Sequence, residues 1–140
     1  MKRFDPESNP LQRWKLGIGF DEIQLEKAPV GKVVTLKVRE TLRKKDYDEF
    51  VPMLEGLMKN GSKIRLIVEL HDFEGWTAGA LWEDTKFAAR HFGDIERLAV
   101  VGEARWEKGI TLFIKPFTKA EVRYFDMLEV DKARRWIREE

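Results

Sequence analysis

Five short segments of the chain have the pattern of apolar and polar residues that predicts β-strands. Residues 33–38 (VVTLKV) alternate polar Thr35 and Lys37 with apolar neighbours, which indicates a strand with one buried face. Residues 64–70 (IRLIVEL) and 95–101 (IERLAVV) are almost continuously apolar, as is typical of central strands covered on both faces. The other strands are expected at residues 22–27 and 121–125.

Helical periodicity and capping signals predict four α-helices, at about residues 46–59, 78–91, 104–115 and 131–138. The first helix opens with the capping-box spacing of Asp46 and Glu49. We expect Pro52 to make its first turn irregular, because proline has no backbone N–H. The core face of this helix is predicted from one stripe of residues: Tyr47, Phe50, Leu54, Leu57 and Met58. Asp131 is expected to cap the last helix.

The order of these elements predicts the fold class. A β-hairpin followed by alternating helices and strands indicates an α/β fold with a mixed, mostly parallel sheet, in which right-handed crossover helices join the parallel strands. Residues 1–12 contain two prolines and no periodicity, so they are expected to form a flexible tail. Residues 13–140 are expected to form a single domain.

Composition and charge exclude several classes of protein. The chain has 140 residues, of which 43% are hydrophobic and 36% are charged, as in ordinary globular domains. Its 26 basic residues nearly balance 25 acidic ones, which argues against a nucleic-acid-binding protein. The absence of cysteine excludes disulfides and cysteine-bound metals. No apolar run approaches the roughly 18 residues of a membrane span, and the polar start is unlike a signal peptide. The cytoplasm is therefore the expected location.

Three segments carry a resemblance to a known family. DFEGWTAGALWEDTKF (residues 72–87), ERLAVVGEARW (96–106) and KPFTKAEVRYFD (115–126) resemble the SpoIIAA-like bacterial proteins, a branch with the STAS-type fold. The resemblance covers about residues 20–139. It implies a sheet of four or five strands with about four helices packed mainly on one side, and it implies no reaction and no cofactor. Members of this branch are suggested to sense or carry apolar molecules and to associate with membranes.

The phosphorylation site of the sporulation proteins that name the fold has no counterpart here. Those proteins carry a phosphorylatable serine in an Asp-Ser pair after a central strand. The corresponding residues 72–77 read DFEGWT, in which Thr77 is the only hydroxyl. We expect Thr77 to act as a helix N-cap and not as a switch.

A polar cluster is expected at the carboxyl edge of the sheet, where ligands of parallel sheets bind. It would contain His71, Asp72, Thr77 and Glu103, of which the histidine and the two carboxylates could supply a general base or a divalent-metal site. However, no second histidine lies at ligand spacing and no serine or cysteine nucleophile is near. We therefore predict neither catalysis nor a metal, and keep an enzyme that uses these three residues as an alternative.

Aromatic residues are concentrated on the second and third predicted helices. On the second, Leu81, Trp82, Thr85, Ala88 and Ala89 share one face, which we predict to be the core face. Ala80 and Phe87 fall on the opposite side, so Phe87 is expected to be exposed. On the third helix, Trp106, Ile110, Phe113 and Ile114 form an apolar face.

These aromatics predict an apolar patch or pocket at the boundary of the two helices. Its expected residues are Trp76, Trp82, Phe87, Trp106, Ile110, Phe113 and Phe117. Lys115 and Lys119 flank Phe117 and would contact anionic headgroups or a partner's carboxylates. The favoured function is a non-catalytic module that binds an apolar or lipid-like ligand, with peripheral contact at the inner face of the membrane. A homodimer or a protein–protein regulatory module is the second hypothesis.

Overall fold

A five-stranded sheet forms the centre of the protein. The structure is a computed structural model that describes residues 19–91, 93–114 and 119–140. The side chains of residues 111–114 are not described. The strands are β1 (Gly19–Ala28), β2 (Gly31–Leu42), β3 (Ile64–Trp76), β4 (Ile95–Gly102) and β5 (Glu121–Asp126). They lie in the order β1-β2-β3-β4-β5; β1 pairs with β2 antiparallel, and every other pair is parallel. The predicted α/β class with a mixed, mostly parallel sheet is confirmed.

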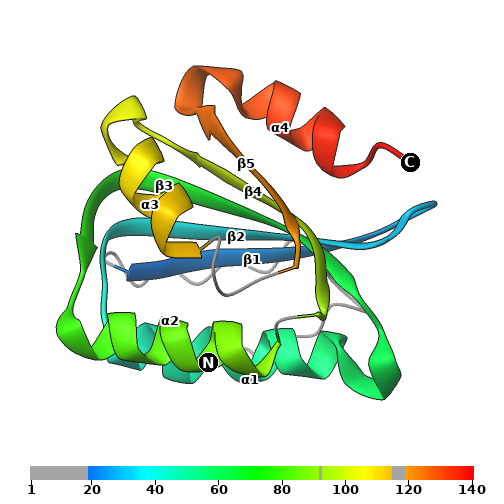
Figure 1. Cartoon of the computed structure of the whole chain (residues 1–140), viewed down its shortest axis with the longest axis horizontal. Coiled ribbons are helices and arrows are strands. Elements are labelled where there is room, and N and C mark those ends of the chain that lie inside the picture. Colours follow the sequence, from blue (N-terminus) through cyan, green and yellow to red (C-terminus); the bar gives the residue numbers. More distant parts are fainter. Residues whose placement is uncertain (1–18, 92, 115–118) are drawn as a thin grey trace.

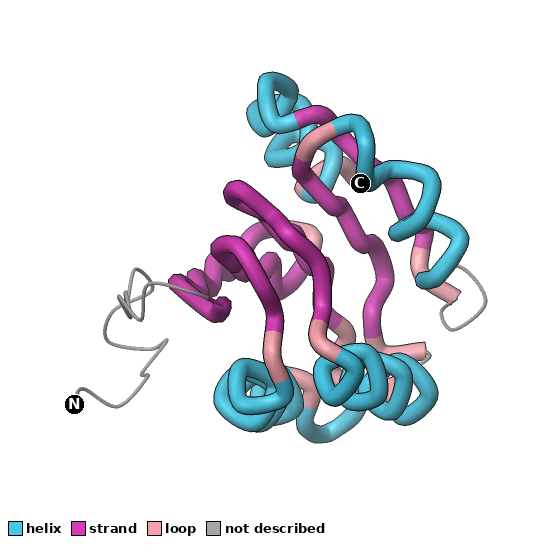
Figure 2. The backbone as a smooth tube through the Cα atoms, turned by 90° about the vertical axis from the view of Figure 1, so that its left-hand side faces the viewer, coloured by secondary structure: helices cyan, strands magenta, loops and turns pink. Residues whose placement is uncertain are grey.

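Three helices join the parallel strands in sequence, and a fourth follows the last strand. These helices are α1 (Lys44–Leu57), α2 (Ala78–Arg90), α3 (Glu107–Ile114) and α4 (Val130–Ile137). Short 3₁₀ turns lie at Lys59–Gly61, Ala104–Trp106 and Met127–Glu129. Crossovers between parallel strands are right-handed with few exceptions. Because β2, β3, β4 and β5 lie in the sheet in chain order, each right-handed crossover places its helix on the same face. Figures 1 and 2 show α1 and α2 side by side on that face and α4 on the other.

The sheet separates two apolar clusters. Alternate residues of β3 enter them: Ile64, Leu66 and Leu70 join the larger cluster with α1, α2 and Ile110 of α3. Ile67 enters the smaller cluster, which includes residues of α4. The helices therefore pack mainly on one side, and α4 covers part of the opposite face.

Arginines on the second face hold α4 against the sheet. Arg97 Nη1 donates to the Trp136 carbonyl at 2.8 Å, and its guanidinium lies 5.2 Å from the centre of the Trp136 ring. Arg65 Nη1 donates to the Ile137 carbonyl at 3.1 Å. These bonds reach carbonyls of the last turn of α4, where intrahelical partners run out. The Trp136 carbonyl also accepts from the Glu139 N–H at 3.2 Å. The expected cap by Asp131 is wrong: α4 begins at Val130, and Asp131 lies inside its first turn.

The start of α1 also differs from the expectation. The helix begins at Lys44, so Asp46 lies in its first turn, and Pro52 lies well inside the helix and not in its first turn. Asp46 is fully buried, and its carboxylate accepts hydrogen bonds from the backbone N–H groups of Arg43 (2.8 Å) and Phe20 (3.2 Å). Asp46 thus closes the first turn of α1 and ties it to β1.

Only a glycine fits beside Asp46. Gly19 has φ +89°, and a Cβ atom there would lie 2.3 Å from Asp46 Oδ1. A side chain would therefore clash with a buried carboxylate, in a backbone conformation that L-residues rarely adopt. This contact fixes where α1, which forms one wall of the pocket described below, sits relative to the sheet.

Candidate functional site: an apolar pocket with a polar end

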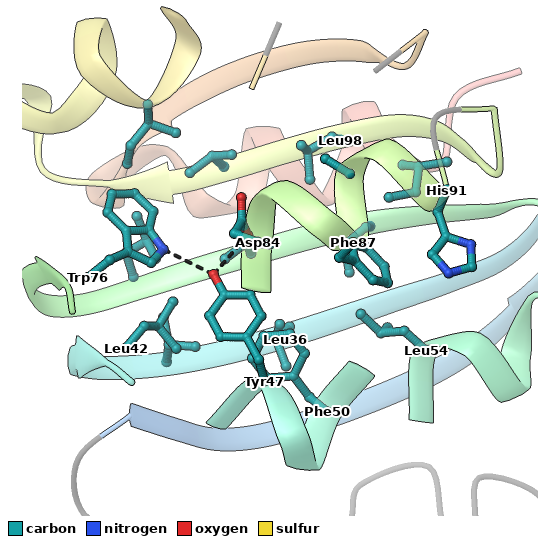
Figure 3. Close-up of a pocket in the computed structure, with 18 residues that line it drawn as sticks. Leu36, Leu42, Tyr47, Phe50, Leu54, Trp76, Asp84, Phe87, His91 and Leu98 are labelled. Carbon is teal, nitrogen blue, oxygen red and sulfur yellow. Dashed lines mark hydrogen bonds between the residues drawn. The ribbon is translucent and has the colours of Figure 1, made fainter. Parts of the chain in front are cut away.

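An apolar pocket of about 110 Å³ lies between the sheet and helices α1 and α2 (Figure 3). Its walls come from the inner faces of β2, β3 and β4, from both helices, and from α3. The apolar lining residues are Leu36, Val38, Leu42, Phe50, Leu54, Leu66, Val68, Leu70, Phe87, Ala88, Ile95, Leu98, Val100 and Ile110. The remaining described lining residues, Tyr47, Trp76, Asp84 and His91, supply the polar side-chain atoms. Such a lining favours a nonpolar occupant with few polar groups.

Three residues form a hydrogen-bonded chain at one end of the pocket. Trp76 Nε1 donates to Tyr47 Oη at 3.1 Å, and the Tyr47 hydroxyl donates to Asp84 Oδ1 at 2.8 Å (Figure 3). Burial raises the pKa of Asp84 to about 6, although the hydrogen bond from Tyr47 acts in the opposite direction. Burial, together with the neighbouring charge of Asp84, also raises the pKa of Tyr47 well above its usual value. Asp84 is therefore a carboxylate in an unfavourable, mostly apolar setting.

His91 lies at the other end, beyond Phe87 (Figure 3). One ring nitrogen, Nδ1, is 2.8 Å from Asp94 Oδ2, and the other, Nε2, is 2.8 Å from Glu55 Oε2. The ring also lies against Phe87, with 4.8 Å between the ring centroids. Because both nitrogens already have carboxylate partners, His91 closes this end of the pocket and offers no open group to a ligand.

An irregularity in β3 aims Trp76 at the pocket. Pairing between β2 and β3 shifts after Arg39–His71 and resumes at Thr41–Gly75, so β3 carries additional residues there. Asp72, at φ +51°, lies inside this irregularity. Phe73, in this irregular segment, is buried, and its ring packs edge-on against Trp76 with 4.8 Å between centroids. The polar segment after residue 71 therefore serves to bend the strand.

The predicted core face of α2 is wrong except for Ala88, which lines the pocket. Trp82 is 64% exposed and Leu81 37% exposed, and neither lines the pocket, whereas Phe87 is only 8% exposed and Ala80 is fully buried. The inner face of α2 carries Ala80, Asp84, Phe87, Ala88 and His91, spaced as one helical stripe. Asp84 is the reason for the error: a carboxylate on the buried side makes that side look polar in sequence.

The other predicted patch residues lie in several places. Trp76 and Ile110 line the pocket. Trp106 is half-buried beside Phe73, and its Nε1 donates to the Phe73 carbonyl at 3.1 Å. Lys119 is exposed. Outside the described residues or side chains lie Phe113, Lys115 and Phe117.

The residues proposed for a polar edge make separate contacts. His71 Nε2 is 3.3 Å from Glu69 Oε1, exposed Asp72 pairs with Arg39 at 3.8 Å, and Glu103 pairs with Arg105 at 3.1 Å. No hydrogen bond or ion pair between described residues joins Glu103 to His71 or Asp72. In the described part of the chain, no group of three or more histidine and acidic side chains is placed to hold a metal ion.

Thr77 has the predicted capping role. Its Oγ1 accepts a hydrogen bond from the Ala80 N–H at 3.2 Å, at the first turn of α2. The Thr77 N–H donates to the Leu42 carbonyl at 2.9 Å, which joins the start of α2 to the end of β2. Thr77 therefore fixes the position of the helix that carries Asp84 and Phe87.

Two residues at the polar end of the pocket, Tyr47 and Asp84, are absent from the patch predicted from the sequence. The core stripe predicted on α1 includes Tyr47, which is correct for its ring, but that prediction says nothing of its hydroxyl. Asp84 could have been found by its position, because it lies four residues after Ala80 and three before Phe87, where a buried stripe requires an apolar residue. The opposite side of α2 carries the larger apolar residues Leu81 and Trp82, so the sequence pattern favours that side as the core face.

Comparisons with known proteins bear on the fold and the family. The model of the SpoIIAA-like family matches residues 33–138, which is more than half of the chain. The crystal structure of an uncharacterised protein with a SpoIIAA-like fold from Shewanella loihica is similar, with a TM-score of 0.70 and 22% identity, over 82% of this chain and 91% of the other. At that identity the likeness shows the fold alone. Among curated proteins, no match is found.

Proposed function

Since the chain belongs to the SpoIIAA-like family, we propose that it is a non-catalytic module that binds a small apolar or lipid-like ligand in the pocket beneath α1 and α2. The family and its fold support a non-catalytic regulatory module in general. The kind of ligand is our inference from the pocket, which is the single observation that carries the proposal.

The size and lining of the pocket support a small nonpolar occupant. An engineered cavity of roughly 150 Å³ lined by leucine, isoleucine and phenylalanine stays dry and binds benzene in another protein. The pocket here is about 110 Å³ and is similarly lined. One aromatic ring or a short acyl segment would therefore fit with modest widening, and a longer chain would require α2 to move outward.

Toluene is a suitable probe, because it is apolar and about the right size. We expect titration with toluene to shift the methyl resonances of Leu98 and Val100 in NMR spectra, because both residues line the pocket on β4. Ala88→Leu should abolish these shifts, since the larger side chain would extend into the same space. Ala89→Leu is the matched control: Ala89 is the next residue on α2, is exposed and does not line the pocket.

The proposal fails if toluene, up to its solubility, leaves the pocket resonances unchanged in the wild type. It also fails if Ala88→Leu, shown to be folded by its thermal transition, binds toluene as well as Ala89→Leu does.

A second candidate function is peripheral membrane contact through the outer face of α2. Trp82, Lys86 and Arg90 are all exposed, and their spacing of four residues places them on one side of the helix. An exposed tryptophan followed by two cations suits the interface of a bilayer with anionic lipids. In the described part of the chain, no helix is long and apolar enough to cross a membrane.

Sedimentation with vesicles of phosphatidylcholine and phosphatidylglycerol tests this contact. We expect the wild type to sediment with them and Trp82→Ser to lose most of that binding. Leu128→Ser is the control, because Leu128 is the most exposed large apolar residue of the described chain and lies outside α2. Equal binding by the wild type and Trp82→Ser would refute a role for this face.

A further inference from the structure

Among the described residues, the side chains at the polar end of the pocket leave no hydrogen-bond donor for a ligand. Tryptophan has one side-chain N–H and tyrosine one O–H. The Trp76 N–H is used by Tyr47, and the Tyr47 O–H is used by Asp84. At the opposite end, both nitrogens of His91 face carboxylates. Every donor among the polar lining residues described above is therefore engaged within the protein.

What remains at the pocket is an acceptor. Asp84 is only partly buried, and among the described residues its carboxylate has a single hydrogen-bond partner, Tyr47, on Oδ1. The second oxygen, Oδ2, has no hydrogen-bond partner among those residues. An ionised carboxylate offers about four acceptor sites over its two oxygens. Hydrogen bonds to a charged acceptor are roughly twice as strong as neutral ones.

From this arrangement we infer that the ligand is an apolar molecule that carries a hydroxyl group, and that the hydroxyl donates a hydrogen bond to Asp84. This inference rests on the proposed ligand-binding function and narrows the class of ligand. It also disfavours carboxylate ligands such as fatty acids, because they would place a second negative charge beside Asp84. The lining includes no lysine or arginine among the described residues to offset that charge.

The ionisation of Asp84 is consistent with this selectivity at neutral pH. Its pKa of about 6 leaves most of the carboxyl group ionised at pH 7.5. Tyr47 remains protonated there, because its pKa is raised. The Tyr47 proton thus stays on its bond to Asp84 and leaves the second oxygen to accept from the ligand.

Four probes of similar shape test the inference by NMR titration at pH 7.5: toluene, phenol, anisole and benzoate. Phenol carries the donor, anisole keeps the oxygen without the donor, and benzoate carries the charge. We expect phenol to bind about ten-fold or more tightly than anisole, as a hydrogen bond to a charged group implies. Benzoate should bind at least ten-fold more weakly than phenol.

The decisive variant is Asp84→Asn, which keeps the shape and an acceptor for Tyr47 but turns the second oxygen into an N–H donor. The preference for phenol over anisole should then fall about ten-fold or more. Asp48→Asn is the matched control: Asp48 is exposed on α1, pairs with Lys44 at 3.2 Å and lies outside the pocket. That variant should keep the wild-type preference.

The possible outcomes separate this inference from the proposed function. If none of the four probes binds, both are wrong. If toluene and anisole bind but phenol binds no more tightly than anisole, or if Asp84→Asn keeps the wild-type preference, only the inference is wrong. Tight binding of benzoate would overturn it as well. Asp84→Leu, an apolar side chain of similar shape, provides a second variant that should also lose the preference for phenol.

Discussion

At the scale of single residues, Asp84 is where the sequence departs most from what packing alone would select. A carboxylate in an apolar setting is costly unless it is hydrogen-bonded, and here one hydrogen bond from Tyr47 compensates only in part. The same position could hold a leucine at lower cost in stability. Retaining a carboxylate there is understandable if it contacts something that enters the pocket.

The raised pKa of Asp84 predicts how the stability of the protein depends on pH. The folded-state pKa of about 6 lies above the ordinary value of 3.8, so the folded protein holds this proton more tightly than the unfolded chain does. The resulting stabilisation is fully present below pH 4 and is lost as the pH rises through 6. The difference between these two pKa values corresponds to roughly 3 kcal/mol at most.

Urea denaturation at pH 4.5 and pH 7.5 measures this effect. Between these values, the free energy of unfolding of the wild type should fall by up to about 2 kcal/mol relative to Asp84→Asn, which does not titrate. Glu26 has a lowered pKa, because Arg138 donates a hydrogen bond to it, and it contributes a slope of the opposite sign. That slope is present in both proteins and cancels in the comparison. If the free energy of unfolding changed with pH equally in the two proteins, the raised pKa of Asp84 would be contradicted.

At the scale of the element, α2 shows how a correctly predicted helix can have the wrong face inward. Its bounds and its cap at Thr77 follow from local signals in the sequence. Its orientation depends on which side fits against α1 and the sheet. The observed orientation buries Ala80 and Phe87 and allows Asp84 to reach the hydroxyl of Tyr47. The alternative would bury Trp82, whose side chain is much larger than that of Ala80.

The observed orientation of α2 and the orientation predicted from the sequence lead to opposite expectations for the stability of two variants. Phe87→Ala should lower the free energy of unfolding by about 3 kcal/mol, because it removes a buried ring from the larger core. Trp82→Ala should change it by no more than about 0.5 kcal/mol, because its ring is mostly in solvent. Both values can be taken from urea denaturation at pH 7.5. A larger loss for Trp82→Ala than for Phe87→Ala would indicate that the helix is turned the other way.

At the scale of the whole molecule, the topology explains why the pocket is on one face. Three successive crossover helices lie on the same side of a sheet whose strands follow chain order, so that side receives the larger core and the pocket. Of the helices that the structure describes, α4 alone lies on the opposite side, held by Arg65 and Arg97. That face also carries buried carboxylates: Glu69 accepts a hydrogen bond from Arg134 of α4 at 3.3 Å, and Glu22 pairs with Lys37 at 3.3 Å.

Most of the fold could be predicted from the sequence, but of the 18 described residues that line the pocket only Trp76, Phe87 and Ile110 belong to the predicted patch. Strand and helix positions depend on residues within a few positions of one another, which a linear pattern records. The pocket depends on contacts such as Tyr47 with Asp84, 37 residues apart. Trp76 and Ile110 could be selected because concentrated aromatic and aliphatic residues mark an apolar site. The hydroxyl of Tyr47 and the carboxylate of Asp84 could not be selected. In the sequence, Tyr47 fits the core stripe of its helix and Asp84 resembles an ordinary surface residue.

The sequence by itself determined the class of fold, the order of the strands and helices, the cap at Thr77 and the absence of cysteine chemistry. Each of these depends on local periodicity or composition. Only the tertiary structure decided which side of α2 faces inward, that Asp46 joins β1 to α1, and that Asp84 stands at the end of an apolar pocket with its second oxygen unpaired by described residues. The physical reason is that the burial and hydrogen bonding of a side chain are set by the residues packed around it, and these come from distant parts of the chain.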